Sequence, residues 1–286
     1  MMLILDGIAS LAPRYRGFVL DLWGVVHDGQ AAFPGVAEAL ARLREGGARI
    51  VFLSNAPRRS HVVEAQLTGF GIDRALYDAA MTSGEITWRL LRDRAHPFVR
   101  DLGPRALHIG AARDHSVVED LGITLTDRPD EADWLLNTGP DPERGGQSVD
   151  PYEPTLRAAL ERGFPMLCVN PDRAVVVGGG RIICAGALAE RYAALGGATL
   201  EIGKPDPAAY DPVMALLDLP RAAVLAIGDS PHTDLAGAQA AGLDAVWALG
   251  GLAAEEGLAE AGPDTLAARA KAEGVSPIAA LRALRW

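Results

Sequence analysis

The chain has 286 residues, of which 49% are hydrophobic, and a formal net charge of −10. This length supports one large domain or two smaller ones. The acidic balance argues against a nucleic-acid partner, because phosphate backbones require clustered Lys and Arg. The two cysteines, Cys168 and Cys184, form no CxxC pair, so we expect neither a disulfide framework nor a zinc site. This cysteine usage fits a cytoplasmic location. We also expect neither a signal peptide nor a membrane span, because Asp6 interrupts the N-terminal apolar run and no apolar stretch reaches about 18 residues.

The first elements alternate between short apolar runs and longer periodic ones. Residues 18–22 and 49–53 form apolar runs, and residues 35–45 between them carry apolar side chains at helical spacing. The same pattern returns near the far end, with runs at 223–227 and 244–248 and a predicted helix at 233–241. Continuous apolar strands that alternate with helices predict a parallel sheet covered on both faces.

The middle of the chain has its own strand-like runs, at residues 106–109, 134–136, 166–169 and 174–177, and a Pro- and Gly-rich segment at 138–154. We interpret residues 86–180 as a second α/β unit inserted into a first unit made of residues 1–85 and 181–286. The predicted fold is therefore α/β: a Rossmann-like three-layer α/β/α core with a parallel sheet and an inserted α/β domain.

Four polar segments each follow a predicted strand, at residues 21–25, 53–55, 203–207 and 228–234. The carboxyl ends of parallel strands converge on one crevice, where ligands bind. These segments are therefore expected to share a site although they lie far apart in the sequence.

Three of these segments each offer one side chain suited to phosphoryl transfer. Asp21 can attack phosphorus, although a carboxylate there also fits a structural turn. Ser54, with neighbouring Asn55, can bind a phosphoryl oxygen or simply cap a helix. Lys204, framed by Gly and Pro, can neutralise the charge of a nucleophile and a phosphate, whereas most lysines are solvated at the surface.

The fourth segment holds two carboxylates that are five residues apart, Asp229 and Asp234. Two carboxylates can bind a hard cation. Alternatively, they can cap the start of a helix and interact favourably with its dipole. Each segment is a weak indication alone, but their order is specific. The chain contains no P-loop, HExxH, GxSxG or convincing GxGxxG motif that would compete with it.

The ordered set resembles the haloacid dehalogenase superfamily, and within it the class IIA, NagD-like branch, which carries a large α/β cap. The resemblance extends over most of the chain and includes Gly35 and residues 51–55, 82–84, 169–172, 203–205 and 228–242. It implies a Mg²⁺-dependent phosphatase that acts on a small phosphorylated metabolite through an aspartyl-phosphate. It also implies that residues 86–180 are the cap and that a homodimer forms through it.

The resemblance assigns a role to each motif residue. It implies Asp21 as the nucleophile, Ser54 and Asn55 as phosphoryl ligands, and Lys204 as the group that stabilises negative charge. The Mg²⁺ ligands that it implies are Asp21, the backbone carbonyl of Trp23, Asp229 and, in support, Asp234.

Trp23 departs from the family pattern, which has an Asp two residues after the nucleophile. That Asp protonates the leaving group and then activates water, and an indole can do neither. General acid–base assistance contributes roughly 10²–10⁴-fold. Three interpretations stay open: the leaving group departs unprotonated; His27, Asp28 or His232 substitutes for the acid; or the protein binds phosphate esters with little turnover. Trp23 itself can form an apolar wall or stack on a substrate ring.

The cap is expected to set substrate choice, because it closes over the phosphate site. Asn170 and Asp172 follow a predicted strand and are candidate substrate-binding residues, although Asn-Pro also marks an ordinary turn. The alternative function is a phospho-ligand-binding protein with degenerate catalysis. Non-phosphate chemistry fits less well, since dehalogenation needs no acidic metal loop and residues 86–180 contain no lysine for the Schiff base of a phosphonatase.

Overall fold

A seven-stranded parallel sheet forms the centre of the larger unit of the protein, in a computed structural model that describes residues 2–177 and 180–286. The strand order is β1-β14-β13-β12-β2-β3-β4, and every neighbouring pair is parallel. The strands are β1 (Ile4–Leu5), β2 (Gly17–Leu20), β3 (Arg49–Ser54), β4 (Ala79–Thr82), β12 (Val224–Gly228), β13 (Asp244–Ala248) and β14 (Ala279–Leu281).

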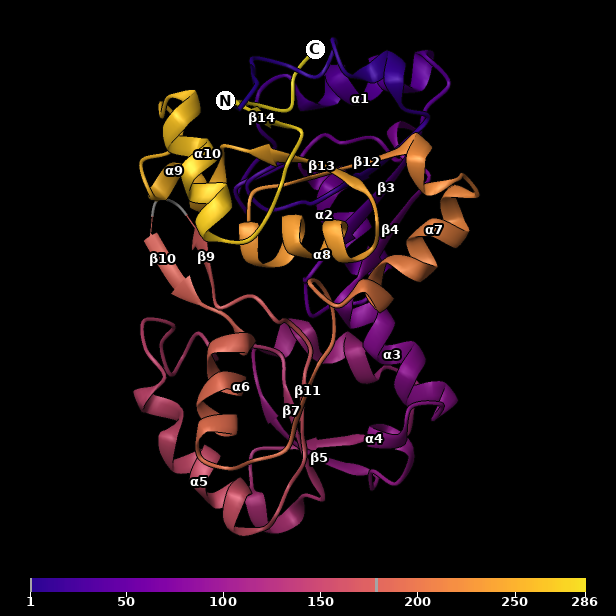
Figure 1. Cartoon of the computed structure of the whole chain (residues 1–286). Coiled ribbons are helices and arrows are strands. Elements are labelled where there is room, and N and C mark those ends of the chain that lie inside the picture. The colour runs from indigo at the N-terminus through magenta and orange to yellow at the C-terminus, as the bar shows by residue number, and fades with distance from the viewer. Residues whose placement is uncertain (1, 178–179) are drawn as a thin grey trace.

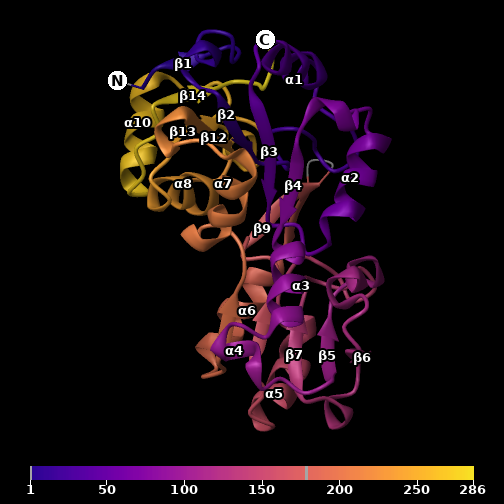
Figure 2. The same ribbon diagram turned by 90° about the vertical axis from the view of Figure 1, so that its right-hand side faces the viewer.

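Helices cover both faces of this sheet (Figures 1 and 2). Successive strand residues point to opposite faces, so Phe18 and Leu20 pack into one core and Val19 into the other. The first core contains α1 (Val36–Glu45) and α2 (Ser60–Gly69). The second contains α7 (Asp211–Leu217), α8 (Ala236–Ala240) and α10 (Pro263–Ala272). The predicted three-layer α/β/α arrangement is confirmed.

The second unit lies below the first in Figure 1 and is reached through α3 (Ser83–Asp93). Its five-stranded parallel sheet has the order β11-β8-β7-β5-β6. The strands are β5 (Arg105–Ile109), β6 (Thr124–Thr126), β7 (Trp134–Asn137), β8 (Met166–Cys168) and β11 (Thr199–Glu201). One face packs against α5 (Glu153–Glu161) and α6 (Ala185–Ala194), and the other against α3 and α4 (Pro97–Arg100).

The second sheet extends beyond residue 180, where the sequence interpretation ended the inserted unit. β11 pairs with β8, and Leu188 and Tyr192 of α6 pack into the core beside Met166. Residues 185–201 therefore lie with the second sheet. The predicted strand at 174–177 is β9 (Ala174–Val177), which forms an antiparallel hairpin with β10 (Gly180–Ile183).

The β9–β10 hairpin lies between the two units, beneath α9 (Gly251–Glu255) in Figure 1. Arg181 and Glu255 form an ion pair of 3.1 Å between the hairpin and α9. The remaining elements are a π-helical turn at Pro231–Leu235 and 3₁₀ turns at Ala12–Arg14, Arg74–Leu76, Ala112–Val118, Pro129–Glu131, Asp150–Tyr152, Pro207–Tyr210 and Arg221–Ala223. Among the described residues, no helix combines the length and apolar character needed to cross a membrane.

Candidate active site

Three polar side chains lie at the carboxyl ends of neighbouring strands. Asp21 follows β2, Ser54 ends β3 and Asp229 follows β12. Because β2 pairs in parallel with both β3 and β12, these ends meet at one edge of the sheet. All three residues are buried, with at most 8% of their surface exposed. The predicted convergence of the motifs is therefore seen in the structure.

Lys204 is the buried cation of this cluster. Its Nζ donates to Asp21 Oδ1 at 2.7 Å, to Asp234 Oδ1 at 2.6 Å and to the carbonyl oxygen of Leu53 at 2.8 Å. Burial lowers the pKa of Lys204, but the two carboxylates outweigh this and hold the pKa well above its ordinary value. The ammonium group is therefore a fixed positive charge beside Asp21.

Asn55 holds Lys204 in place and joins the two units. Its Oδ1 accepts from the Lys204 backbone N–H at 2.8 Å, and its Nδ2 donates to the Lys204 carbonyl at 3.0 Å and to Asp172 Oδ1 at 2.9 Å. Ser54 Oγ accepts from the Ala56 N–H at 3.2 Å, which fixes the hydroxyl at the start of the next turn.

Carboxylate oxygens of Asp21, Asp229 and Asp234 lie within 4.8 Å of one another. Burial raises the pKa of Asp21 to about 7, and the charge of Asp234 adds to this effect while Lys204 opposes it. Burial and the nearby Asp21 charge also raise the pKa of Asp229 well above its usual range. One ammonium does not offset three buried carboxylates, so this all-oxygen donor set fits a hard divalent cation.

The loop after Asp21 approaches Asp229 closely. Gly24 has a φ of +74°, and a Cβ there would lie 2.2 Å from Asp229 Oδ2. The same Oδ2 accepts the Leu252 N–H at 2.9 Å, and Asp234 Oδ2 accepts the Ser230 N–H at 3.1 Å. Only glycine at position 24 permits this packing, so the loop conformation and the carboxylate positions depend on each other.

Trp23 and His27 form an aromatic pair behind the nucleophile. The rings meet edge to face at 5.2 Å, and His27 meets Phe70 at the same distance on its other side. Gly29 lies under the indole, because a Cβ there would be 2.2 Å from Trp23 Cη2. His27 Nδ1 accepts the Gly29 N–H at 3.0 Å, and burial lowers the pKa of His27 to about 4.

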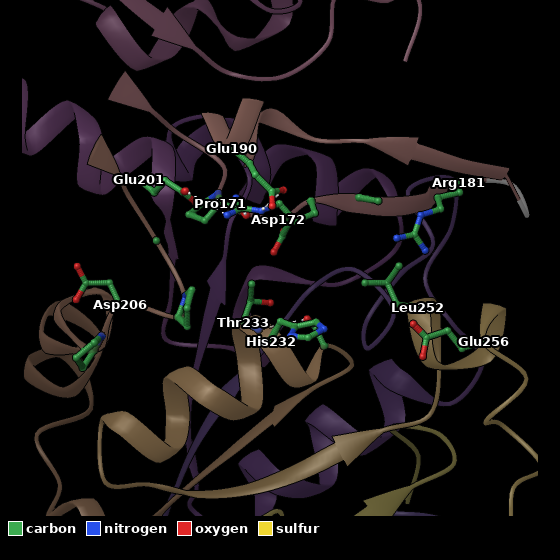
Figure 3. Close-up of a pocket in the computed structure, with 16 residues that line it drawn as sticks. Pro171, Asp172, Arg181, Glu190, Glu201, Asp206, His232, Thr233, Leu252 and Glu256 are labelled. Carbon is green, nitrogen blue, oxygen red and sulfur yellow. Dashed lines mark hydrogen bonds and ion pairs between the residues drawn. The ribbon is translucent and has the colours of Figure 1, made fainter. Parts of the chain in front are cut away.

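His27 is one of the three candidate replacement acids, and the structure does not bring it into the cavities that Asp21 lines. Its ring is 2% exposed and packs as core, so it supports Trp23 rather than facing Asp21. The other two candidates also lie elsewhere. Asp28 Oδ1 accepts the N–H groups of Gln30 and Ala31 within its own turn. The exposed His232 lines the outer wall of the site (Figure 3), on the far side of Asp172 from Asp21's cavities, and pairs with Glu273 at 3.3 Å.

Three cavities meet around Asp172. We name the smallest, of about 30 Å³, the inner cavity; Asp21, Trp23, Lys204, Asp229 and Asp234 line it. The cap-side cavity, of about 120 Å³, has walls from Asp21, Trp23, Ser54 and Asn55 on the larger unit and from Asn170 and Asp172 on the second unit. The outer cavity, of about 720 Å³, opens on the other side of Asp172 (Figure 3). Asp172 lines all three.

The structure adds Arg58 and Asp114 to the cap-side cavity, and sequence reasoning missed both. Arg58 Nε and Asp114 Oδ1 lie 3.4 Å apart, across the two units, and both side chains are largely buried. Burial lowers the pKa of Arg58 and raises that of Asp114. Arg58 follows Ser54 by only four residues, which is a usable sequence indication. Asp114 sits in a 3₁₀ turn with no comparable pattern around it.

Comparisons with known proteins agree with this geometry. Residues 18–124 match the family model of haloacid dehalogenase-like hydrolases, and residues 201–271 match a second HAD-like hydrolase model. A solved haloacid dehalogenase-like hydrolase from Brucella suis 1330 is 32% identical, covers 98% of this chain and 99% of its own, and superimposes with a TM-score of 0.83.

Two curated relatives are more distant in sequence. The sugar-phosphatase AraL of Bacillus subtilis is 28% identical over 83% of this chain and 84% of its own. Human chronophin is 28% identical over 86% of this chain and 84% of its own. The fold and these matches define an enzyme that hydrolyses phosphoric esters. The chain belongs to the haloacid dehalogenase-like hydrolase family, in its class IIA, NagD-like branch.

Proposed function

We propose that this protein is a Mg²⁺-dependent phosphatase of a small phosphorylated metabolite, and that Asp21 is its nucleophile. One observation carries the proposal: the side chains at positions 21, 54, 204 and 229 surround adjoining cavities at one edge of the sheet. Together they supply the groups that phosphoryl transfer requires: a nucleophile, hydrogen-bond donors, a fixed ammonium and a cation site.

In this proposal Asp21 attacks phosphorus and forms an aspartyl-phosphate. Lys204 already donates to Asp21 Oδ1 at 2.7 Å, so its charge lies where negative charge develops during transfer. The hydroxyl of Ser54 binds a phosphoryl oxygen from the cap-side cavity. The amide of Asn55, which the sequence suggests as a second phosphoryl ligand, already donates its N–H groups to Asp172 and the Lys204 carbonyl, so it positions Lys204 instead. None of these groups has to move far to act, because the hydrogen bonds that hold them are already formed.

Asp21, Asp229, Asp234 and the backbone carbonyl of Trp23 would hold the Mg²⁺ ion. The fit rests on the donor set itself, which is all oxygen, buried and short of positive charge. When bound, the ion supplies the charge that lets a dianionic phosphate enter a cavity lined by carboxylates.

The second unit acts as the cap, and we place its end near residue 201 because β11 belongs to its sheet. The cap-side cavity is small and mixes apolar walls with Arg58, Asp114 and Thr138. This lining suits a short polar leaving group with hydroxyls, such as a sugar or polyol, and relatives named as sugar phosphatases support that class. A homodimer through the cap and a cytoplasmic location complete the proposal, and light scattering of the purified protein tests the dimer.

The test is phosphate release from a panel of sugar phosphates, nucleotides and acyl phosphates in the presence of Mg²⁺. We expect release from at least one small phosphate ester, and its loss with EDTA or in Asp21→Asn. Activity that survives either treatment would contradict the assigned nucleophile or the metal dependence.

Trp23 favours a second candidate, a phospho-ligand-binding protein with degenerate catalysis. That candidate predicts Mg²⁺-dependent binding of phosphate esters with negligible release of phosphate. It also predicts that Trp23→Asp creates or sharply raises phosphatase activity, because the substitution restores the acid of the family pattern. A decrease of an existing activity in Trp23→Asp would exclude this candidate.

A further inference from the structure

Trp23 cannot supply the proton that the leaving group of the proposed phosphatase needs, and a replacement acid is required only if that proposed function holds. A replacement acid must share a cavity with both the nucleophile and Trp23, since the leaving-group oxygen departs on that side. Four carboxylates other than Asp21 do so in the part of the chain that the structure describes: Asp114, Asp172, Asp229 and Asp234. Asp172 lines both the inner and the cap-side cavity.

The other three carboxylates have competing partners. Asp229 and Asp234 belong to the oxygen cluster that fits a cation, and Asp234 also accepts from Lys204 at 2.6 Å. Asp114 is already paired with the Arg58 guanidinium at 3.4 Å. Of the four carboxylates, Asp172 alone lies outside the oxygen cluster that fits a cation and has no arginine partner in these cavities.

Asp172 is held in a defined position. Its Oδ1 accepts from Asn55 Nδ2 at 2.9 Å, and its backbone N–H donates to Asn170 Oδ1 at 3.0 Å within the loop after β8. Figure 3 shows the side chain extending from the cap loop toward Thr233 on the larger unit. A carboxyl group of the second unit therefore lines the same two cavities as Asp21.

The surroundings of Asp172 favour a protonated carboxyl group. Burial raises its pKa, and the charge of Asp234 adds to this effect. Lys204 and the hydrogen bonds from Asn55 and Thr233 act in the opposite direction but do not outweigh burial. A raised pKa moves this half-buried carboxyl group toward the protonated form that a general acid needs at the start of the reaction.

We propose that Asp172 is the general acid and base of this enzyme, in place of the acid that the family pattern puts at position 23. As an Asp21 oxygen bonds to phosphorus and the ester P–O bond breaks, the carboxyl of Asp172 gives its proton to the leaving alkoxide. The resulting carboxylate then removes a proton from water as the water oxygen attacks phosphorus. The Asp21–phosphorus bond breaks, inorganic phosphate forms, and Asp172 is protonated again.

The experiment compares Asp172→Asn with the wild type on two esters, glycerol phosphate and p-nitrophenyl phosphate, with Mg²⁺. The amide still accepts from Asn55 but cannot transfer a proton. We expect kcat on glycerol phosphate to fall by roughly 10²–10⁴-fold. p-Nitrophenolate departs without a proton, so the variant should release a burst of one equivalent per active site, followed by slow turnover as the aspartyl-phosphate accumulates.

The control is Glu190→Gln, which removes another cap carboxylate from the outer cavity (Figure 3). Glu190 is 70% exposed and lines neither the inner nor the cap-side cavity, so both activities should equal those of the wild type. If Asp172→Asn folds poorly by thermal melting, Asp172→Glu provides the comparison. It keeps a titratable carboxyl and should retain more glycerol phosphatase activity than any variant without one, such as Asp172→Ala.

The outcomes separate this role from the proposed function. Equal loss on both esters without a burst, or a rise in KM at constant kcat, would show a structural or binding role and overturn the proposal. Unchanged kcat in Asp172→Asn would overturn it as well. A wild type that releases no phosphate from any ester would instead contradict the phosphatase function, and the role of Asp172 with it.

Discussion

The neighbours of Trp23 accommodate the tryptophan that stands where the family pattern has an aspartate. The indole occupies the space over Gly29 and lies against the edge of His27. His27 in turn is buried, neutral and fixed by the Gly29 N–H. The indole makes an apolar wall in the cavities that Asp21 lines, and His27 packs against its far edge. A carboxylate at position 23 would have added a further negative charge to a site that already holds three. Proton transfer then has to come from elsewhere in the site.

The buried His27 predicts a pH dependence of stability. Its pKa is about 4 in the folded protein against about 6.5 when unfolded. Between these two pKa values the unfolded chain binds more protons at this residue than the folded protein does. The free energy of unfolding therefore rises with pH across this window, and the contribution of His27 to it is lost as pH falls from 6.5 toward 4. The effect is at most about 3 kcal/mol for this residue.

Urea unfolding near neutral pH and near the lower end of that window measures the effect. We expect a smaller difference between the two conditions in His27→Asn than in the wild type. His108, whose pKa is also lowered by burial to about 4, contributes equally to both proteins and does not obscure the comparison. An identical difference in the two proteins would contradict a buried neutral His27.

A second prediction at this scale concerns Trp23. Trp23→Phe keeps an aromatic wall against His27 but removes the indole N–H. Because proton transfer is assigned to Asp172, kcat on an alkyl phosphate should change far less in Trp23→Phe than in Asp172→Asn. Steady-state kinetics on the same ester compares the two variants, and a loss of equal size in both would argue for a direct catalytic role of the indole.

The sequence revealed part of the site and missed the rest, for identifiable reasons. Asp21, Ser54 and Asp229 each end an apolar run that can only be a buried parallel strand, so their convergence follows from topology. Asp114 and its contact with Arg58 depend on how the cap sits on the larger unit, and no local pattern encodes that arrangement. The position of His27 could not be predicted, because a histidine three residues past the Gly24 turn can point into the site or into the core.

Some secondary-structure elements were predictable from the sequence and others were not. The strands of the larger unit were predictable because both faces of β2 and β12 are buried, which requires continuous apolar residues. β11 was not, since Thr199–Glu201 is short and only partly buried. The side chains of α6 suit either sheet, and only their packing against Met166 and Leu135 assigns the helix to the second unit.

The 3₁₀ turn at Ala112–Val118 carries a prediction for substrate binding. It places Asp114 opposite Arg58 in the cap-side cavity, and Asp114 is not a member of the oxygen cluster of Asp21, Asp229 and Asp234. Asp114→Asn should therefore raise KM for a sugar phosphate more than it lowers kcat, because it alters contacts to the leaving group and not to the reacting atoms. A fall in kcat at constant KM would place Asp114 in the chemistry.

At the scale of the whole molecule, an acidic protein with a net charge of −10 must admit an anionic substrate. The site has one fully buried ammonium, Lys204, against the carboxylates of Asp21, Asp229 and Asp234. A bound cation should therefore stabilise the fold as well as the reaction. Ligand linkage gives about 2.7 kcal/mol at a Mg²⁺ concentration 100 times the Kd.

Thermal melting with and without Mg²⁺ tests this without any substrate. The melting temperature of the wild type should rise with Mg²⁺, and the rise should disappear in Asp229→Asn, which removes one ligand charge. Asp206→Asn, on the exposed rim of the outer cavity, should keep the full rise. A rise of equal size in Asp229→Asn would place the cation elsewhere.

The central claim is that a phosphoryl group is transferred to Asp21. The most direct measurement is acid quenching of the enzyme during turnover of p-nitrophenyl phosphate with Mg²⁺, followed by proteolysis and mass spectrometry of the peptide that contains residue 21. We predict one phosphoryl group on Asp21 in the wild type, a larger phosphorylated fraction in Asp172→Asn and none in Asp21→Asn. Turnover with no modified Asp21, or a phosphoryl group on another residue, would contradict it.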